Sequence, residues 1–73
     1  MTLNQLKLGQ QARIINIKDS SIKRRLLDIG LIKGSIVSMY LISPFKDPHA
    51  YKIKNAIIAI RNNDAMNIEV ELL

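Results

Sequence analysis

The fold is decided by one stretch in the second half of the chain, Tyr51-Lys52-Ile53-Lys54-Asn55-Ala56-Ile57-Ile58-Ala59-Ile60-Arg61. Its first four residues alternate between apolar and charged, which predicts an extended segment with Tyr51 and Ile53 on one face. Asn55 follows at a tight connection, because asparagine tolerates a positive φ better than most residues. Residues 57–61 are rich in isoleucine and predict the returning strand. The stretch is therefore expected to form a β-hairpin.

Outside the hairpin, three more strands and a loop are expected. Residues 12–17 are short and β-branched, residues 35–42 are the longest apolar candidate, and residues 68–72 alternate with Glu69 and Glu71 facing outward. Residues 43–48 form a loop, since Pro44 and Pro48 forbid continuous ladder pairing. Near the N-terminus, Gly9 permits a turn, and residues 62–66 are compatible with a single helical turn.

One clear helix is predicted between the first two strands. Gly30 supplies a left-handed stop, after which Leu31 folds back towards the helix. N-cap oxygens are available from three consecutive residues, Asp19, Ser20 and Ser21. The apolar stripe of the helix has the spacing i, i+4, i+7 and comprises Ile22, Leu26 and Ile29.

These elements predict a mainly β protein in a single domain, residues 1–73. The chain has 48% hydrophobic but only 4% aromatic residues and no cysteine, so its stability must come from aliphatic packing rather than disulfides. Five short strands in a chain of this length are too few for a two-sheet sandwich, but they can close into a small, strongly curved barrel. Closure of this kind would remove the exposed sheet edges.

Catalysis is not expected from this sequence, and neither is a cofactor. The three glycines form no phosphate-binding motif, the serines lack a nucleophile-elbow context, and no pair of carboxylates stands out. His49 is the only histidine, and with Asp47 nearby it makes a poor metal site, because zinc normally takes three or four protein ligands. His49 is interpreted as an exposed loop residue, with a weak ion site at His49 or Asp47 as the alternative.

The charge pattern favours an anionic partner. The formal net charge is +5, and the densest positive cluster is Lys23-Arg24-Arg25. Arg24 is expected to pair with Asp28 across one helical turn, and Arg25 flanks the apolar stripe. Nucleic acid is not expected, because stacking aromatics among the cations are missing. No apolar run reaches the ~20 residues of a membrane span, and the N-terminus lacks a signal-peptide layout, so a cytoplasmic location is the simplest expectation.

The proline-flanked loop is the second candidate for an interface. A phenylalanine between prolines exposes a rigid apolar group, which suits an interface anchor. The alternative is that Phe45 folds back and caps one end of a thin barrel. The sequence favours neither reading over the other.

Taken in order, these motifs resemble the FeoA family, the ferrous iron transport protein A domains. The resemblance runs over essentially the whole chain, and its pieces are specific in combination. They are Leu3-x-x-Leu6-x-x-Gly9, Lys23-Arg24-Arg25-Leu26-Leu27-Asp28-Ile29-Gly30-Leu31-Ile32-Lys33-Gly34, Ser43-Pro44-Phe45-Lys46-Asp47-Pro48, Ile58-Ala59-Ile60-Arg61 and Asp64-Ala65-Met66-Asn67-Ile68-Glu69-Val70.

The resemblance implies a small cytosolic protein with an SH3-like barrel that is not an enzyme. It implies that the chain binds and supports the cytoplasmic GTPase region of FeoB, the membrane ferrous iron transporter, and so meets the membrane only through that partner. A stand-alone module that binds nucleic acid or responds to a metal is the alternative, because related SH3-like domains occur at the ends of metal-dependent repressors. Self-association is a further option.

The resemblance also assigns roles to individual positions. Two positions depart from the family pattern, since glycine is usual where this chain has Lys46 and Asn55. The positions expected to hold the fold are Gly9, Gly30, Gly34, Asn55 and Arg61. Those expected to meet the partner are Arg24, Arg25, Leu31, Lys33, Pro44, Phe45, Lys46, Asp47 and Pro48.

Overall fold

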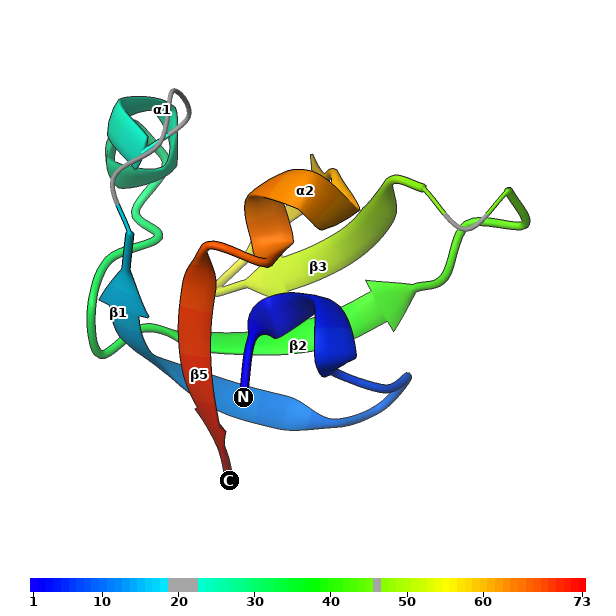
Figure 1. The fold of residues 1–73 in the computed structure, drawn as a ribbon, viewed down its shortest axis with the longest axis horizontal. Helices are drawn as coiled ribbons and strands as arrows, with labels where there is room; N and C mark the ends of the chain where they lie inside the picture. The colour runs from blue at the N-terminus through cyan, green and yellow to red at the C-terminus, as the bar shows by residue number, and fades with distance from the viewer. Residues whose placement is uncertain (19–22, 46) are drawn as a thin grey trace.

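All five expected strands are present, and they form one antiparallel sheet in the order β4-β3-β2-β1-β5 (Figure 1). The computed structural model describes residues 1–18, 23–45 and 47–73. The strands are β1 (Gln11–Ile17), β2 (Ile36–Leu41), β3 (His49–Ile53), β4 (Ala56–Ile60) and β5 (Ile68–Leu72). The helices are η1 (Leu3–Gln5), α1 (Lys23–Asp28) between β1 and β2, and α2 (Asn62–Ala65). The predicted mainly β class with one short helix between the first two strands is confirmed.

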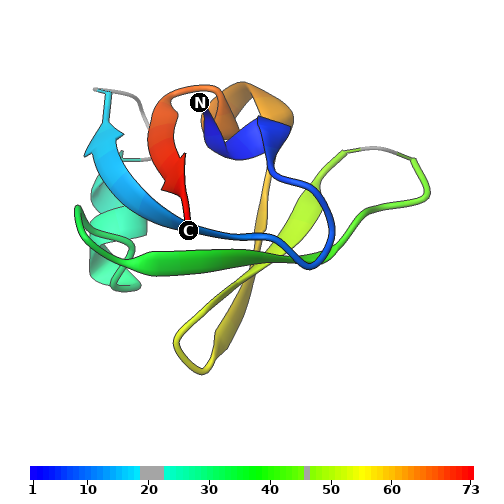
Figure 2. The same cartoon turned by 90° about the horizontal axis from the view of Figure 1, so that it is seen from below.

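The sheet curves strongly around a single aliphatic core, which is clearest in the view from below (Figure 2). In β3 the predicted face is confirmed, because Tyr51 and Ile53 are both buried. β1 contains a register shift between Ile14 and Asn16, so that Ile14 and Ile17 both point inward. The buried set is Leu3, Leu6, Ala12, Ile14, Ile17, Leu26, Leu31, Val37, Met39, Tyr51, Ile53, Ile60, Ala65, Ile68 and Val70.

The predicted stop of α1 is confirmed by its hydrogen bonds. Gly30 has a φ of 89°, in the left-handed region that favours glycine. Its N–H donates to the Leu27 carbonyl at 3.0 Å, and the N–H of Leu31 donates to the Leu26 carbonyl at 2.9 Å. These two bonds make a Schellman motif, in which the residue after glycine packs back on the helix. Leu26 and Leu31 are accordingly both buried.

The apolar stripe of the helix differs from the prediction. Ile29 was expected in the core but is 44% exposed. The reason is that the chain leaves the helix at Asp28 and turns at Gly30, so Leu31 takes the buried place that a longer helix would have given to Ile29. The predicted N-cap and Ile22 lie outside the described residues.

The hairpin between β3 and β4 is present, but its left-handed residue is not Asn55. Lys54 has a φ of 54° and is the only non-glycine residue with a positive φ in the described ranges. Ile53 pairs with Ala56, so the turn contains only Lys54 and Asn55 between the paired residues. A two-residue turn of this kind requires a positive φ at its first central residue, and here that residue is the lysine.

The sheet keeps two edges, so the expectation that closure would remove both is wrong. At one edge, the Val70 N–H donates to the Met1 carbonyl at 2.8 Å, and Thr2 forms a bridge with Glu69. The N-terminal residues therefore cover β5. At the other edge, β4 pairs with β3 alone among the described strands.

Candidate partner-binding surface

Exposed cations and exposed aliphatic side chains occur together at the end of the molecule that carries α1 (Figure 1). Three aliphatic residues there are nearly half exposed, at 44–47%, and two of them, Leu27 and Ile29, were not predicted as contacts. The sequence signal for them was the helix stop, since a glycine that turns Leu31 inward leaves its neighbours outside. We call the following set the α1 end: Lys23, Arg24, Arg25, Leu27, Ile29, Ile32 and Lys33.

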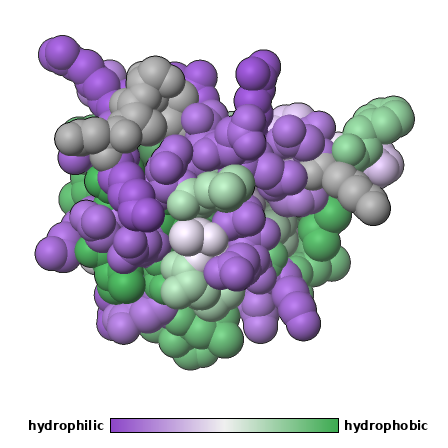
Figure 3. Space-filling view, in the orientation of Figure 1, coloured by the Kyte–Doolittle hydropathy of each residue, from purple (hydrophilic) through white to green (hydrophobic). Residues whose placement is uncertain are grey.

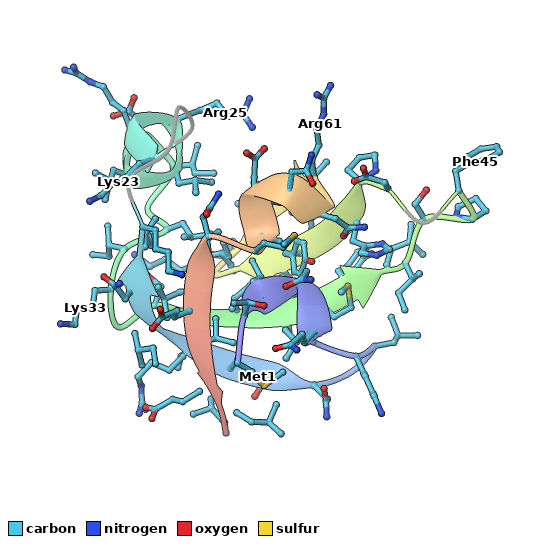
Figure 4. All side chains as sticks on the ribbon, in the orientation of Figure 1. Met1, Lys23, Arg25, Lys33, Phe45 and Arg61 are labelled. Atoms are coloured by element: carbon cyan, nitrogen blue, oxygen red, sulfur yellow. The ribbon has the colours of Figure 1, made fainter. Side chains whose placement is uncertain are left out.

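A shallow hollow lies between β1 and α1 within this end. Its volume is about 210 Å³, and it is lined by Asn16, Ile17, Lys23, Leu27 and Lys33. The two lysine side chains lie on the α1 side of the molecule (Figure 4). A hollow lined by two aliphatic side chains and two lysines suits an apolar side chain that has a carboxylate beside it.

Leu31 is not available to a partner, contrary to its assignment as a contact residue. Its side chain is 0% exposed, because the Schellman turn places it in the core next to Leu26. The adjacent Ile32 is 47% exposed and takes its place at the surface.

The charges of the α1 end are not neutralised by the predicted helical pair. Within the described residues, the ion pairs are Arg13–Glu71 at 3.2 Å and Lys18–Glu69 at 3.9 Å. Both join β1, or the residue directly after it, to β5, so Arg24 and Asp28 form no such pair. The guanidinium groups of Arg24 and Arg25 are on exposed residues.

The loop between β2 and β3 forms the second candidate surface. We call Ser43, Pro44, Phe45, Asp47 and Pro48 the loop end; Lys46 lies outside the described residues. The sequence left open whether Phe45 is exposed or folds back to cap the barrel. In the structure Phe45 is 88% exposed, so it does not cap the barrel. In the space-filling view an apolar group projects from the body at this place (Figure 3).

Hydrogen bonds hold the loop end against the rest of the fold. The Asn62 N–H donates to Asp47 Oδ1 at 3.0 Å, so the carboxylate accepts from an N–H group in the first turn of α2. The Ser43 N–H donates to His49 Nδ1 at 3.3 Å. His49 is half-buried at the start of β3 and is therefore not the exposed loop histidine that was expected.

The described residues contain no group of three or more His, Asp or Glu side chains that could hold a metal ion. His49 and Asp47, the weak candidates, are instead engaged in the loop contacts described above. The hydroxyl of Tyr51 is buried and has no hydrogen-bond partner among the described atoms. Its burial, together with the nearby Asp47 carboxylate, raises the pKa of Tyr51 to about 12.

Of the five positions expected to hold the fold, the three glycines differ from Asn55 and Arg61. Gly9, Gly30 and Gly34 all have φ values between 83° and 94°, which only glycine adopts readily. Asn55 and Arg61 are exposed, and the Arg61 side chain points away from the sheet (Figure 4). Arg61 contributes to the fold through its backbone carbonyl, which accepts hydrogen bonds from the N–H groups of Asp64 and Ala65.

The two candidate surfaces are not brought together. Lys23, Arg25 and Lys33 lie at one end of the molecule and Phe45 at the other (Figure 4). A single small ligand does not reach both. A partner of domain size can contact one end, or can span both.

Comparisons with known proteins identify the family to which this chain is similar. Residues 1–72 match the family model described as the FeoA domain. A Porphyromonas gingivalis protein, named as a fusion of Fe(2+) transport protein A with the Fe(2+) transporter FeoB, is 32% identical over all of this chain, which spans only 9% of that protein. A Campylobacter jejuni protein, named as a candidate Fe(2+) transport protein A, is 34% identical over the full length of both chains.

A solved structure agrees in fold. The Stenotrophomonas maltophilia FeoA, crystallised with zinc, superposes with a TM-score of 0.86 at 29% identity, covering 97% of this chain and 89% of that one. That protein is described as a prokaryotic SH3 domain protein. The five-stranded sheet described above is therefore an SH3-like fold. None of the described helices has the length and hydrophobicity to cross a membrane.

Proposed function

This chain belongs to the FeoA family, and we propose that it is a cytoplasmic accessory protein of ferrous iron uptake that binds the GTPase region of the transporter FeoB. The observation that carries the proposal is the fusion relative, in which the two named parts share one polypeptide. Domains joined in this way remain at fixed stoichiometry and high effective concentration, which is useful when they act on one another. The same contact between separate chains must be made by a docking surface.

The α1 end has the composition of such a surface. Leu27, Ile29 and Ile32 offer apolar contact area, and the exposed cations Arg24, Arg25 and Lys33 belong to the same end. Interfaces commonly place apolar anchors at the centre and charged groups at the rim, where the charges steer association. We therefore place the main contact at the α1 end, against an apolar segment of the partner that carries Asp or Glu.

The loop end supports the proposal as a second contact. Phe45 exposes nearly all of its ring, and an aromatic side chain buries a large apolar area on binding while fixing only two torsion angles. Because the two ends lie on opposite sides of the molecule, a partner that uses both must be large enough to reach across it (Figure 1).

The test is a titration of the isotopically labelled chain with the purified cytoplasmic region of FeoB, without nucleotide, with GDP and with a non-hydrolysable GTP analogue. Amide shifts at the α1 end are expected to change most, and affinity is expected to fall as salt rises. Replacing both Arg24 and Arg25 with Gln is expected to weaken binding about tenfold or more.

A charge-matched control is available on the hairpin. Lys52→Gln with Lys54→Gln removes the same two charges from exposed positions outside the α1 end and is expected to change affinity by less than about threefold. Equal losses in the two double variants would reduce the contact to a net-charge effect. No binding in any nucleotide state, together with unchanged iron uptake when the gene is deleted, would refute the proposed function.

A further inference from the structure

The uncovered edge of the sheet is a second place where this molecule can form an interface. The N-terminal residues cover β5 through the Val70–Met1 hydrogen bond and the Thr2–Glu69 bridge. β4 has no equivalent cover: its backbone bonds in the described ranges are those to β3. The β3–β4 hairpin projects from the body of the molecule (Figure 2).

The register identifies which backbone groups of β4 face outward. Ile53 and Ala56 flank the two-residue turn and so exchange hydrogen bonds with each other. In an antiparallel ladder, such pairs alternate with pairs that do not exchange hydrogen bonds. The pairs Lys52–Ile57 and Ala50–Ala59 are of the second kind. The N–H and C=O groups of Ile57 and Ala59 therefore point away from β3, along the open edge.

The side chains of β4 do nothing to protect this edge. The strand Ala-Ile-Ile-Ala-Ile carries no charge and no proline, which are the usual means of blocking an edge strand. Ile57 is 51% exposed, and Ala56 and Ala59 are exposed as well. Lys54 and Arg61 flank the strand at either end but lie outside it.

We infer that the open edge of β4 pairs antiparallel with β4 of a second copy of this chain, about a two-fold axis at Ile58. In this register, Ile57 faces Ala59 of the second copy, and the outward N–H and C=O groups of both residues are satisfied. A two-fold contact of this type repeats every interaction twice. This inference does not depend on the proposed function, because β4 is not part of the α1 end.

The composition of the strand is what selects a second copy as the occupant. With the axis at Ile58, the ladder pairs Ala56–Ile60 of one copy with the same residues of the other, while Lys54 lies in the hairpin turn and Arg61 directly before α2, both beyond the ladder. No like charges therefore lie directly opposite one another within the ladder. The strand itself is neutral and pairs a large with a small side chain at each outward position.

The association is expected to be weak and to respond to salt in a defined direction. Pairing through one five-residue strand buries less than a standard interface, so the dimer forms only at high protein concentration. Each chain carries a net charge of +5, so the two copies repel one another at long range. Added salt screens that repulsion, and the dimer is therefore expected to strengthen as salt rises.

Sedimentation velocity on the full chain, from micromolar to millimolar concentration, tests the inference. The wild type is expected to move towards the mass of two chains as concentration rises. Ala59→Pro removes an outward N–H without removing a bond to β3, so the fold is expected to persist. Dimerisation is expected to weaken by at least about tenfold, because the substitution acts twice in a two-fold contact.

A second variant and its control keep the test decisive if the proline disturbs folding. Ile57→Lys places a charge on the open edge and is expected to abolish the dimer. The control is Leu72→Lys in β5, the edge strand that the N-terminal residues cover. Leu72 is 50% exposed and Ile57 is 51% exposed, and the Leu72 substitution is expected to leave the dimer intact. A monomer at every concentration and salt, or a dimer that Ile57→Lys leaves unchanged, overturns the inference. The inference is also overturned if the chain never self-associates but its β4 edge binds a β-strand peptide that is flanked by glutamates.

Discussion

The α1 end and the loop end are held in place by different forces. At the α1 end, Leu26 and Leu31 are buried under the helix stop, so apolar packing fixes the segment that carries the exposed cations. At the loop end, the contacts that the structure displays are polar: Asp47 accepts from the Asn62 N–H, and His49 accepts from the Ser43 N–H. The aromatic ring of Phe45 contributes almost nothing to the core, because it is 88% exposed.

This difference separates stability from recognition along the chain. At the α1 end the two functions fall on adjacent residues, because Leu31 is buried while Ile32 is exposed. At the loop end the backbone is anchored by polar groups, and the large apolar side chain is left for solvent or a partner. Substitutions can therefore separate what each end contributes to folding from what it contributes to binding.

The strongest test of the contrast is Leu31→Ala. The substitution empties a fully buried site, and the free energy of unfolding is expected to fall by about 2–5 kcal/mol. The matched variant is Ile32→Ala, at a side chain that is 47% exposed, for which a change within about 0.5 kcal/mol is expected. Urea unfolding followed by circular dichroism measures both. Equal losses would show that Ile32 is also a packing residue and that the α1 end has no separate contact surface.

Tyr51, the third residue of β3, provides a test that depends on pH. Its pKa is raised to about 12, so between pH 10 and 12 the unfolded chain releases a proton that the folded chain keeps. The free energy of unfolding is therefore unaffected by this group below pH 10 and falls above it, by about 2–3 kcal/mol at pH 12. Tyr51→Phe is expected to remove this loss and, because the hydroxyl has no described partner, to keep stability at pH 7.

Tyr40 supplies the control for this titration. Its ring is 51% exposed, so Tyr40→Phe is expected to leave the alkaline loss of stability in place. Thermal unfolding of both variants at pH 7, 10 and 11 distinguishes them. An alkaline loss that persists in Tyr51→Phe would assign the effect to other groups, such as the lysines.

The sequence predicts the fold well because the fold depends on local signals. The alternation in Tyr51–Lys54 and residues 68–72, the glycine stop of the helix and the prolines after β2 each act over a few residues. The errors also arise from local causes. Ile29 was assigned to the core by helical spacing, yet the turn at Gly30 moved Leu31 into that place. Likewise Asn55 was a better candidate for a positive φ than Lys54, but the register of the hairpin puts that requirement on the lysine.

The candidate surfaces were harder to predict, because exposure is decided by contacts distant in sequence. Nothing near Asp47 indicates that its carboxylate meets the start of α2, fifteen residues later. Leu31 and Ile32 are neighbours of similar character, and only the three-dimensional turn distinguishes the buried one from the exposed one. The open edge of β4 was also hidden, since barrel closure depends on how the sheet curves and not on any one strand.

Asp47 tests the polar anchorage of the loop end. Asp47→Ala removes the acceptor of the Asn62 N–H, and the free energy of unfolding is expected to fall by about 1 kcal/mol, as for loss of a helix cap. Asp47→Asn retains an oxygen acceptor and is expected to cost less. Both variants remove the charge that helps raise the pKa of Tyr51, so both are expected to lower that pKa. Denaturant unfolding with a spectroscopic tyrosine titration separates the two effects; equal stability of both variants and the wild type would contradict the anchorage.

The smallest expected effect on stability, that of Phe45→Ala, is the one that decides whether the loop end takes part in binding. The ring is 88% exposed, so its removal is expected to change the free energy of unfolding by less than about 0.5 kcal/mol. If the loop end contacts the cytoplasmic region of FeoB, the same substitution is expected to weaken binding about fivefold or more, since buried aromatics dominate interface energies. Isothermal titration of Phe45→Ala beside the Arg24→Gln and Arg25→Gln double variant compares the two ends directly. Loss of affinity in the arginine variant alone assigns the contact to the α1 end. Losses in both, adding in the combined variant, would mean that one partner spans the molecule, because sites this far apart are expected to contribute independently.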